Sequence, residues 1–157
     1  MPENENWALP PVEKIYEAFS AIADKRIKMS QGCALVSSSD HAKEYTVVWN
    51  ENYYSSNDNA SYWQGYLGYP VIAVLMLQGK INYNCAIPEY FKNINWKKLN
   101  SEYKNKYGKA VSSVLERLMS EAIDVKIIND EVIKVFEQIK ALDIKSKRAQ
   151  KPNQSIK

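Results

Sequence analysis

The chain has 157 residues, of which 45% are hydrophobic and 25% charged, as is typical of one compact globular domain. The longest uncharged apolar run, residues 71–77, is too short to span a bilayer, and the acidic, polar start predicts no secretory signal, so we expect a cytoplasmic protein. The net charge of +3 is unevenly placed, because residues 92–109 contain six lysines against one acid and no acid follows Asp143.

The first predicted elements are a helix and a hairpin. Apolar residues recur at helical spacing over 12–23, and Pro11 suits the first turn of a helix. The runs "CALVSSS" and "EYTVVW", rich in β-branched and aromatic residues, predict two strands joined by a polar turn around His41. The polar, Asn-rich stretch 50–61 that follows predicts a loop.

The apolar run 70–77 predicts a short buried helix that begins at Pro70 and ends at Gly79 in a left-handed conformation. A buried strand is the alternative, because periodicity cannot separate the two structures in so short a run. Residues 86–107 predict a helical region in two pieces.

Residues 111–139 contain apolar side chains at alternating spacings of four and three, the pattern of a coiled-coil seam. A zipper-like helix of this kind forms a dimer, and a polar residue on its seam fixes the register. The alternative is two ordinary helices, broken near residues 123–130 and packed within their own chain. The residues expected to dimerise are Leu115, Leu118, Val125, Asn129, Val132, Phe136 and Ile139.

Together these elements predict an α+β fold, in which a small antiparallel sheet packs with helices and a zipper-like helix follows at the C-terminus. We expect a binding domain over residues 1–108 and a helical dimerisation segment over 109–144. The remaining residues, 145–157, are basic and predict a disordered tail.

Residue types that form catalytic or metal sites are sparse. The single histidine, His41, lies in the predicted turn, and no cysteine or second histidine stands at metal-ligand spacing from it. The neighbours Ser39, Asp40 and His41 have the residue types of a hydrolase triad, but contiguous residues cannot form its geometry. No glycine-rich phosphate loop or nucleophile elbow occurs. We therefore expect no enzymatic activity, no metal and no cofactor.

Eight aromatic residues lie between positions 45 and 69, several of them in polar, Asn-rich surroundings. Stacking on an aromatic ring contributes about 1–3 kcal/mol per base, and aromatic residues near a lysine-rich segment are typical of proteins that bind single-stranded nucleic acid. An apolar protein interface is the alternative use of the same residues. We expect stacking by Trp49, Tyr53, Tyr54, Tyr62, Trp63 and Tyr66, and phosphate contacts from Lys97, Lys98, Lys104 and Lys106, with Arg26 and Lys28.

The predicted hairpin, followed by "YYSSND" and "YPVIAVLM", resembles the SWIM module, in which a hairpin precedes a zinc site and an apolar helix. Tyr54, Ser56, Tyr69 and Val71 stand where the Cys and His ligands of that module would be. The resemblance therefore implies the scaffold without its zinc, and on this reading the chain is a protein–protein interaction module.

A second resemblance covers more of the chain. The stretches "GYPVIAVLMLQGKI" and "INWKKLNSEYKNKY", followed by the zipper-like segment, resemble ThermoDBP-type archaeal single-stranded DNA-binding proteins. In that family an N-terminal domain carries an aromatic cleft with a basic edge, and C-terminal helices dimerise. The resemblance implies a homodimer that binds single-stranded nucleic acid, preferably DNA.

Overall fold

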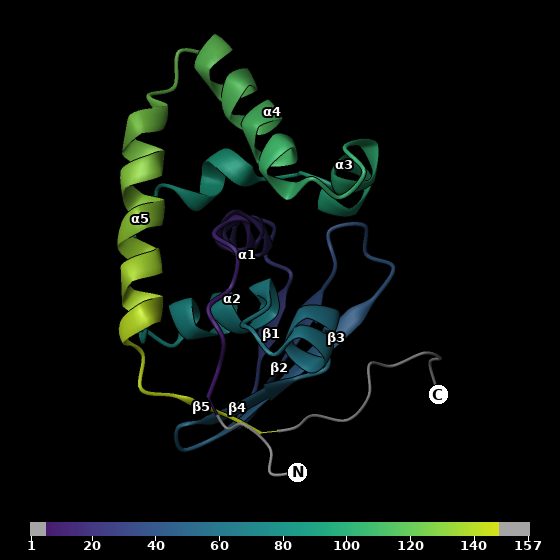
Figure 1. Ribbon diagram of the computed structural model, residues 1–157, viewed down its shortest axis with the longest axis vertical. Helices are drawn as coiled ribbons and strands as arrows, with labels where there is room; N and C mark the ends of the chain where they lie inside the picture. The colour runs from purple at the N-terminus through teal and green to yellow at the C-terminus, as the bar shows by residue number, and fades with distance from the viewer. Residues whose placement is uncertain (1–5, 148–157) are drawn as a thin grey trace.

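The chain forms one helix, then a four-stranded meander, and then a series of helices (Figure 1). The computed structural model describes residues 6–147. It begins with α1 (Glu13–Ala23), β1 (Ile27–Met29), β2 (Cys33–Ser37), β3 (Glu44–Asn50) and β4 (Tyr53–Ser56). The later elements are η1 (Ala60–Gln64), α2 (Tyr69–Leu77), η2 (Pro88–Phe91), α3 (Trp96–Glu102), α4 (Tyr107–Ser120), α5 (Val125–Ala141) and β5 (Lys145–Ser146). The α+β class predicted from the sequence is confirmed.

The sheet has the strand order β1-β2-β3-β4-β5, and its first four strands are antiparallel. The expected hairpin is confirmed as β2 and β3, with Val36 opposite Tyr45. The structure differs from the expected loop over 50–61, because Tyr53–Ser56 pairs with β3 as a strand. In this strand Tyr54 and Ser56 are buried and their neighbours are half-buried, which is the alternation of a strand with one covered face.

α2 lies at the centre of the hydrophobic core. Its residues from Pro70 to Met76 are all buried, because strands β1, β3 and β4 contact it on one side and α1 contacts it on another (Figure 1). The predicted helix is therefore confirmed over the strand alternative. Gly79 has φ +79°, which confirms the left-handed stop that the sequence predicted.

The C-terminal region forms two helices in place of one continuous zipper-like helix. α4 ends at Ser120, Ala122 adopts φ +65°, and the Asp124 side chain accepts a hydrogen bond from the Lys126 N–H at 3.0 Å as the cap of α5. Both helices contact α1, and their inner residues belong to the same core as the sheet and α2. The alternative of two helices packed within their own chain is the one observed.

The last described strand, β5, adds parallel to β4 and makes the sheet mixed. Lys145 and Ser146 are therefore ordered parts of the sheet, although the sequence predicted a disordered tail from 145 onward. The rest of that expected tail, residues 148–157, lies outside the described residues. No helix in residues 6–147 combines the length and the apolar character needed to cross a membrane.

Candidate functional site

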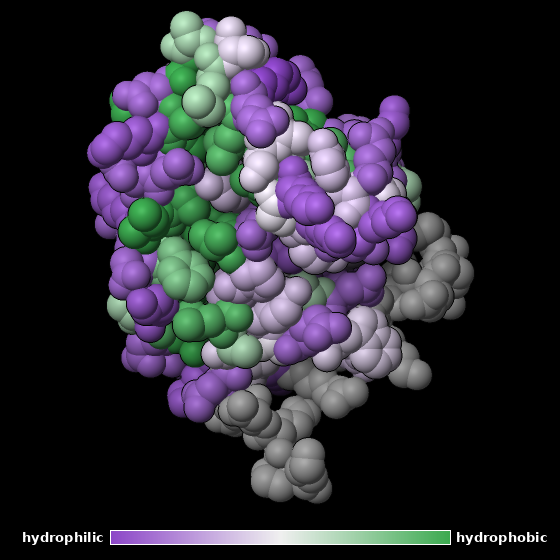
Figure 2. All heavy atoms as spheres, turned by 45° about the horizontal axis from the view of Figure 1, so that its top comes forward, coloured by the Kyte–Doolittle hydropathy of each residue, from purple (hydrophilic) through white to green (hydrophobic). Residues whose placement is uncertain are grey.

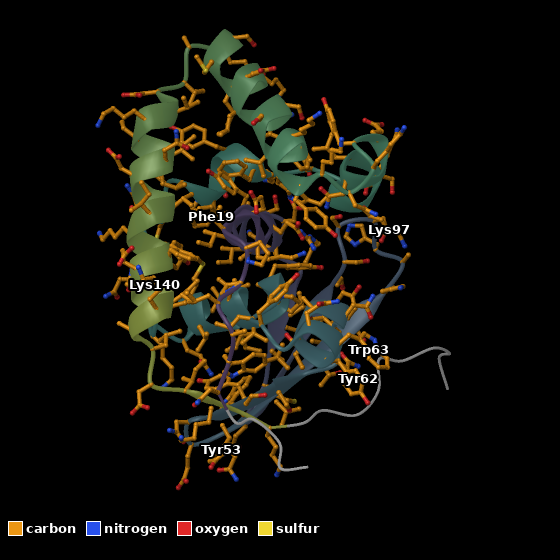
Figure 3. The ribbon with its side chains drawn as sticks, viewed as in Figure 1. Phe19, Tyr53, Tyr62, Trp63, Lys97 and Lys140 are labelled. Atoms are coloured by element: carbon orange, nitrogen blue, oxygen red, sulfur yellow. The ribbon has the colours of Figure 1, made fainter. Side chains whose placement is uncertain are left out.

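A cleft of about 870 Å³ opens between α1, the β2–β3 turn, η1 and α3. Its volume lies within the roughly 300–1,000 Å³ that small-ligand sites occupy. Figure 3 shows Trp63 and Lys97 on the same side of the molecule, on η1 and α3, while Lys140 lies on the far side. The polar and aromatic side chains that line the cleft include Lys14, Glu17, Arg26, Asp40, Lys43, Tyr45, Asp58, Trp63, Tyr66, Tyr69, Trp96, Lys97, Asn100 and Tyr107.

Trp63 forms one edge of the mouth of the cleft, and its residue surface is 58% exposed. The Tyr62 ring meets it edge-on, with ring centroids 4.5 Å apart and planes at 82°. η1 ends at Gly65, whose φ of +75° turns the chain away directly after the tryptophan. Trp63 thus packs against Tyr62 and leaves more than half of its surface open to a ligand.

The segment that carries Trp63 is anchored from beneath by Asp58. This carboxylate is 4% exposed, accepts a hydrogen bond from the Ser61 N–H at 3.1 Å, and also accepts one from the Ser56 hydroxyl. The Ser61 hydroxyl in turn accepts a hydrogen bond from the Gly68 N–H at 3.2 Å. These bonds fix the start of η1 at Ser61 and tie it to Gly68, so the fold positions the segment that carries Trp63.

The opposite wall of the cleft is built from the β2–β3 turn and the start of α3. The Ser39 hydroxyl accepts hydrogen bonds from the backbone N–H groups of Trp96, at 2.9 Å, and Lys97, at 3.4 Å. The Trp96 indole donates to the Ser20 hydroxyl at 2.7 Å, which holds the first turn of α3 against α1. Lys97 and Lys43 are exposed on this wall.

Arg26 and Tyr69 lie together in the buried part of the cleft. The Arg26 guanidinium donates to the Ser37 carbonyl at 2.6 Å, pairs with the Asp24 carboxylate at 3.3 Å, and lies 5.9 Å from the centre of the Tyr69 ring. Burial raises the pKa of Tyr69 and the Arg26 charge opposes that shift. The effect of burial is the larger one, so the phenol stays neutral. Arg26 is 5% exposed and its charge is matched inside the protein, so we assign it a structural role in place of the expected phosphate contact.

Lys14 and Glu17 form a second buried group, one helical turn apart on α1. Their charged atoms Nζ and Oε2 are 3.8 Å apart, and Lys14 Nζ lies 4.9 Å from the centre of the Tyr107 ring. Burial raises the pKa of Glu17, while the Lys14 charge and a hydrogen bond with the Asn100 side chain oppose the shift. Burial lowers the pKa of Lys14, but Glu17 and other neighbouring groups outweigh it, so the net shift is upward and the ammonium stays charged.

The structure brings only part of the expected stacking set to the cleft. Trp63 and Tyr66 line it, and their stacking role stays a prediction. Tyr54 is fully buried and donates its hydroxyl proton to Gln78 at 2.7 Å, so the expected stacking role of Tyr54 is corrected to a core role. Trp49 packs on Tyr54 with ring centroids 6.2 Å apart, and Tyr53 lies near the lower edge of the sheet, away from Lys97 (Figure 3).

The expected phosphate-binding lysines are all exposed but only Lys97 lines the cleft. Lys104 and Lys106 flank Asn105, which does line it, so they extend the basic edge from α3 to α4. Lys98 belongs to a separate hollow beside Arg117, and Lys28 stands on the edge strand β1.

Most of the lining residues were not predicted from the sequence, and they include the charged or polar residues Lys14, Glu17, Lys43 and Asn100. Lys14 and Glu17 could have been noticed in the sequence as an oppositely charged i, i+3 pair on the predicted helix. In the structure Glu17 falls inside the fully buried stretch 15–21 of α1. Asn100 has no comparable local signal, because only the packing of α3 against α1 brings it to Glu17.

The residues expected to dimerise face mainly into their own chain. Leu118, Val132 and Ile139 are buried in the core, and Leu115, Val125 and Phe136 pack against it. Asn129 is exposed and accepts a hydrogen bond from the Tyr16 hydroxyl at 3.4 Å. Figure 2 shows hydrophobic side chains gathered over the α4–α5 side of the surface, and the exposed apolar residues of these helices are Met119, Ile127 and Ile133.

Within residues 6–147, no group of three or more His, Cys, Asp or Glu side chains is placed to hold a metal ion. A family model matches residues 7–145, a range that includes every residue lining the cleft. The chain belongs to the family described as uncharacterised conserved protein UCP014422. No curated protein and no solved structure matches the chain. The family match provides no link to either of the two families that the sequence resembles.

Proposed function

We propose that this member of the family binds single-stranded nucleic acid in the cleft and does not catalyse a reaction on it. The observation that carries the proposal is the placement of Trp63, whose exposed ring stands at the mouth of a cleft that has Lys43 and Lys97 on its other walls. A base that stacks on the indole removes apolar surface from water, and lysines at the rim release counterions from the adjoining phosphates.

The charges of the cleft differ between its mouth and its interior. The exposed charges include Lys43 and Lys97, and Lys104 and Lys106 continue the basic edge beyond them. The acids are engaged: Asp58 is hydrogen-bonded to its own loop, and Asp40 accepts a hydrogen bond from the Ser38 hydroxyl at 2.7 Å. That bond, with one from the Ala42 N–H, lowers the pKa of Asp40. Asp40 therefore stays ionised near Lys97, and the exposed lysines of this edge outnumber it.

The size of the cleft favours an unpaired strand over a duplex. Its volume of about 870 Å³ is that of a small-ligand pocket, and a base can enter it only when it is not paired with another strand. The preference for DNA over RNA rests on the resemblance to ThermoDBP-type proteins, and the use of the same ring as a protein interface is the competing function.

A titration of a fluorescently labelled single strand and of a duplex of equal length tests this proposal. The single strand should bind more tightly, and its affinity should fall steeply between about 50 and 200 mM salt because phosphate contacts release counterions. Equal binding of the duplex, or no binding of either at low salt, would contradict the proposal. Capture of a protein partner whose affinity hardly changes with salt would favour the competing function.

A further inference from the structure

The floor of the cleft contains a polar group that the fold itself leaves incompletely satisfied. Its members are Lys14, Glu17 and Asn100, contributed by α1 and α3. By contrast, the other buried charged residues of the cleft, Arg26 and Asp58, have short hydrogen bonds to neighbouring groups. A ligand that enters beyond Trp63 therefore meets protein groups that can still form hydrogen bonds.

The ion pair within this group is long for buried charges, and the other contact of Glu17 in the group is its hydrogen bond with the Asn100 side chain. Lys14 Nζ and Glu17 Oε2 are 3.8 Å apart, which exceeds ordinary hydrogen-bond distance. Asn100 Oδ1 is shielded from solvent and has no hydrogen-bond partner among the described residues. The last torsion of an asparagine side chain has a broad energy well, so rotation of the amide can turn this oxygen toward the cleft. The same rotation gives up the hydrogen bond with Glu17 and frees that carboxylate for the ligand.

We propose that the floor recognises the Watson–Crick edge of a single guanine base. This inference rests on the proposed function, and it assigns Glu17 and Asn100 as acceptors for the base N–H groups and Lys14 as the donor to its carbonyl oxygen. The Tyr107 ring lies beside Lys14 and Trp63 lies at the mouth, so aromatic surface is present at both depths of the cleft.

The distribution of charge sets which end of a nucleotide points inward. At the floor, the Glu17 carboxyl lies beside the Lys14 ammonium, so an anionic phosphate would gain little there and would meet a like charge. At the mouth, the exposed lysines Lys43 and Lys97 outnumber the lining carboxylate Asp40, whose charge interacts with Lys97. A nucleotide is therefore bound with its neutral base inward and its phosphate outward.

The identity of the base follows from the donors and acceptors of the floor. A carboxylate and an amide oxygen only accept hydrogen bonds, and an ammonium only donates them. Guanine is the base whose Watson–Crick edge has two adjacent donors, N1–H and the 2-amino group, next to an acceptor, O6. Thymine and cytosine each have one donor position on that edge and two acceptors, and adenine has one of each. Good bidentate base contacts discriminate by about tenfold or more.

The test uses labelled eight-residue deoxythymidine strands in which one central position is guanine, inosine, adenine or cytosine. We expect the guanine strand to bind the intact chain about tenfold more tightly than the adenine or cytosine strand. Inosine lacks the 2-amino group, so its strand should lose most of this advantage. Glu17→Gln replaces one acceptor oxygen with a donor and should bring the affinity of the guanine strand down to that of the adenine strand.

Glu131→Gln is the matched control for the removal of a buried carboxylate. Glu131 is 8% exposed on α5, accepts a hydrogen bond from the Asn84 N–H, and lies outside the cleft, so this variant should keep the guanine preference. Binding of all strands with equal affinity, or a guanine preference that survives Glu17→Gln, would overturn the inference and leave the proposed function standing. Failure of every strand to bind would overturn both.

Discussion

The Asp58 carboxylate lies directly against the backbone of Gly68. A Cβ added at Gly68 would lie 2.8 Å from Asp58 Cγ and overlap the carboxylate oxygens, although the φ of this glycine, −73°, is open to any residue. This contact joins the loop before η1 to the start of α2. It therefore couples the position of Trp63 to the central helix of the core.

Gly68→Ala should destabilise the protein, because Asp58 is held by its own hydrogen bonds and cannot move aside easily. Inserting one methyl group into such a packed site costs about 1–3 kcal/mol. Thermal unfolding followed by circular dichroism measures the effect. Gly108→Ala is the control: it lies in α4, its added Cβ would meet only Glu13 Oε2 at 3.6 Å, and it should not lower the midpoint. Equal midpoints for both variants would show that the Asp58–Gly68 contact is loose.

Truncation should destabilise the protein strongly at Leu118 and hardly at all at Ile133, although both are apolar residues of the C-terminal helices. Leu118 is 3% exposed in the core, so Leu118→Ala should cost about 2–5 kcal/mol of unfolding free energy. Ile133 is 59% exposed, so Ile133→Ala should change stability by less than about 0.5 kcal/mol. Chemical denaturation of the two variants measures both values, and similar losses would contradict the observed packing of α4 and α5.

Self-association remains a prediction, and the structure changes the residues that test it. Charged substitution of Leu118 or Val132 would unfold the chain, since both are buried. Ile133→Lys on exposed α5 surface should instead give a monomer with an unchanged thermal midpoint. Sedimentation of the intact chain at roughly tens of micromolar decides whether it pairs at all, because association depends on concentration. A wild-type monomer at that concentration would contradict the predicted homodimer.

Glu17 should make the protein less stable as the pH rises from acid toward neutrality. Burial raises the pKa of this carboxyl above its ordinary value of 4.5, so the folded state keeps a proton that the unfolded state has lost. Between those two pKa values the folded state binds more protons, and the free energy of unfolding falls with increasing pH. Glu17→Gln removes this titration. The thermal midpoint of Glu17→Gln minus that of wild type should therefore increase as the pH rises from 4.5. A difference that stays constant or decreases would contradict the raised pKa of Glu17.

Much of the fold could be predicted because its signals are local. Pro70 and Gly79 bracket an apolar run of helical length, and the β-branched runs around His41 form the predicted hairpin. The break at Asp124 was obscured because the apolar residues keep their spacing of four and three across it. β4 was missed because only four residues form it, and their polar flanks are typical of a loop.

The candidate site was predictable at its mouth and not at its floor. The sequence shows a tryptophan in a polar segment that ends in glycine, and the structure exposes it. The lysine-rich region that contributes Lys97 is also visible in the sequence. The floor depends on Asn100 and Tyr107 approaching α1 from positions more than 80 residues away. Such an approach is set by tertiary packing, which leaves no periodic pattern in the sequence. The same limit explains why Tyr54 was expected at the surface.

The central claim, that the cleft binds an unpaired strand on Trp63, is tested most directly by titrating Trp63→Ala with a labelled single strand at low salt. Met119→Ala is the matched control, because Met119 has the same 58% exposure and lies on α4 outside the cleft. The loss of one stacking contact should weaken binding about tenfold in Trp63→Ala and leave its thermal midpoint unchanged, while Met119→Ala binds as wild type does. Wild-type affinity in Trp63→Ala would contradict the claim.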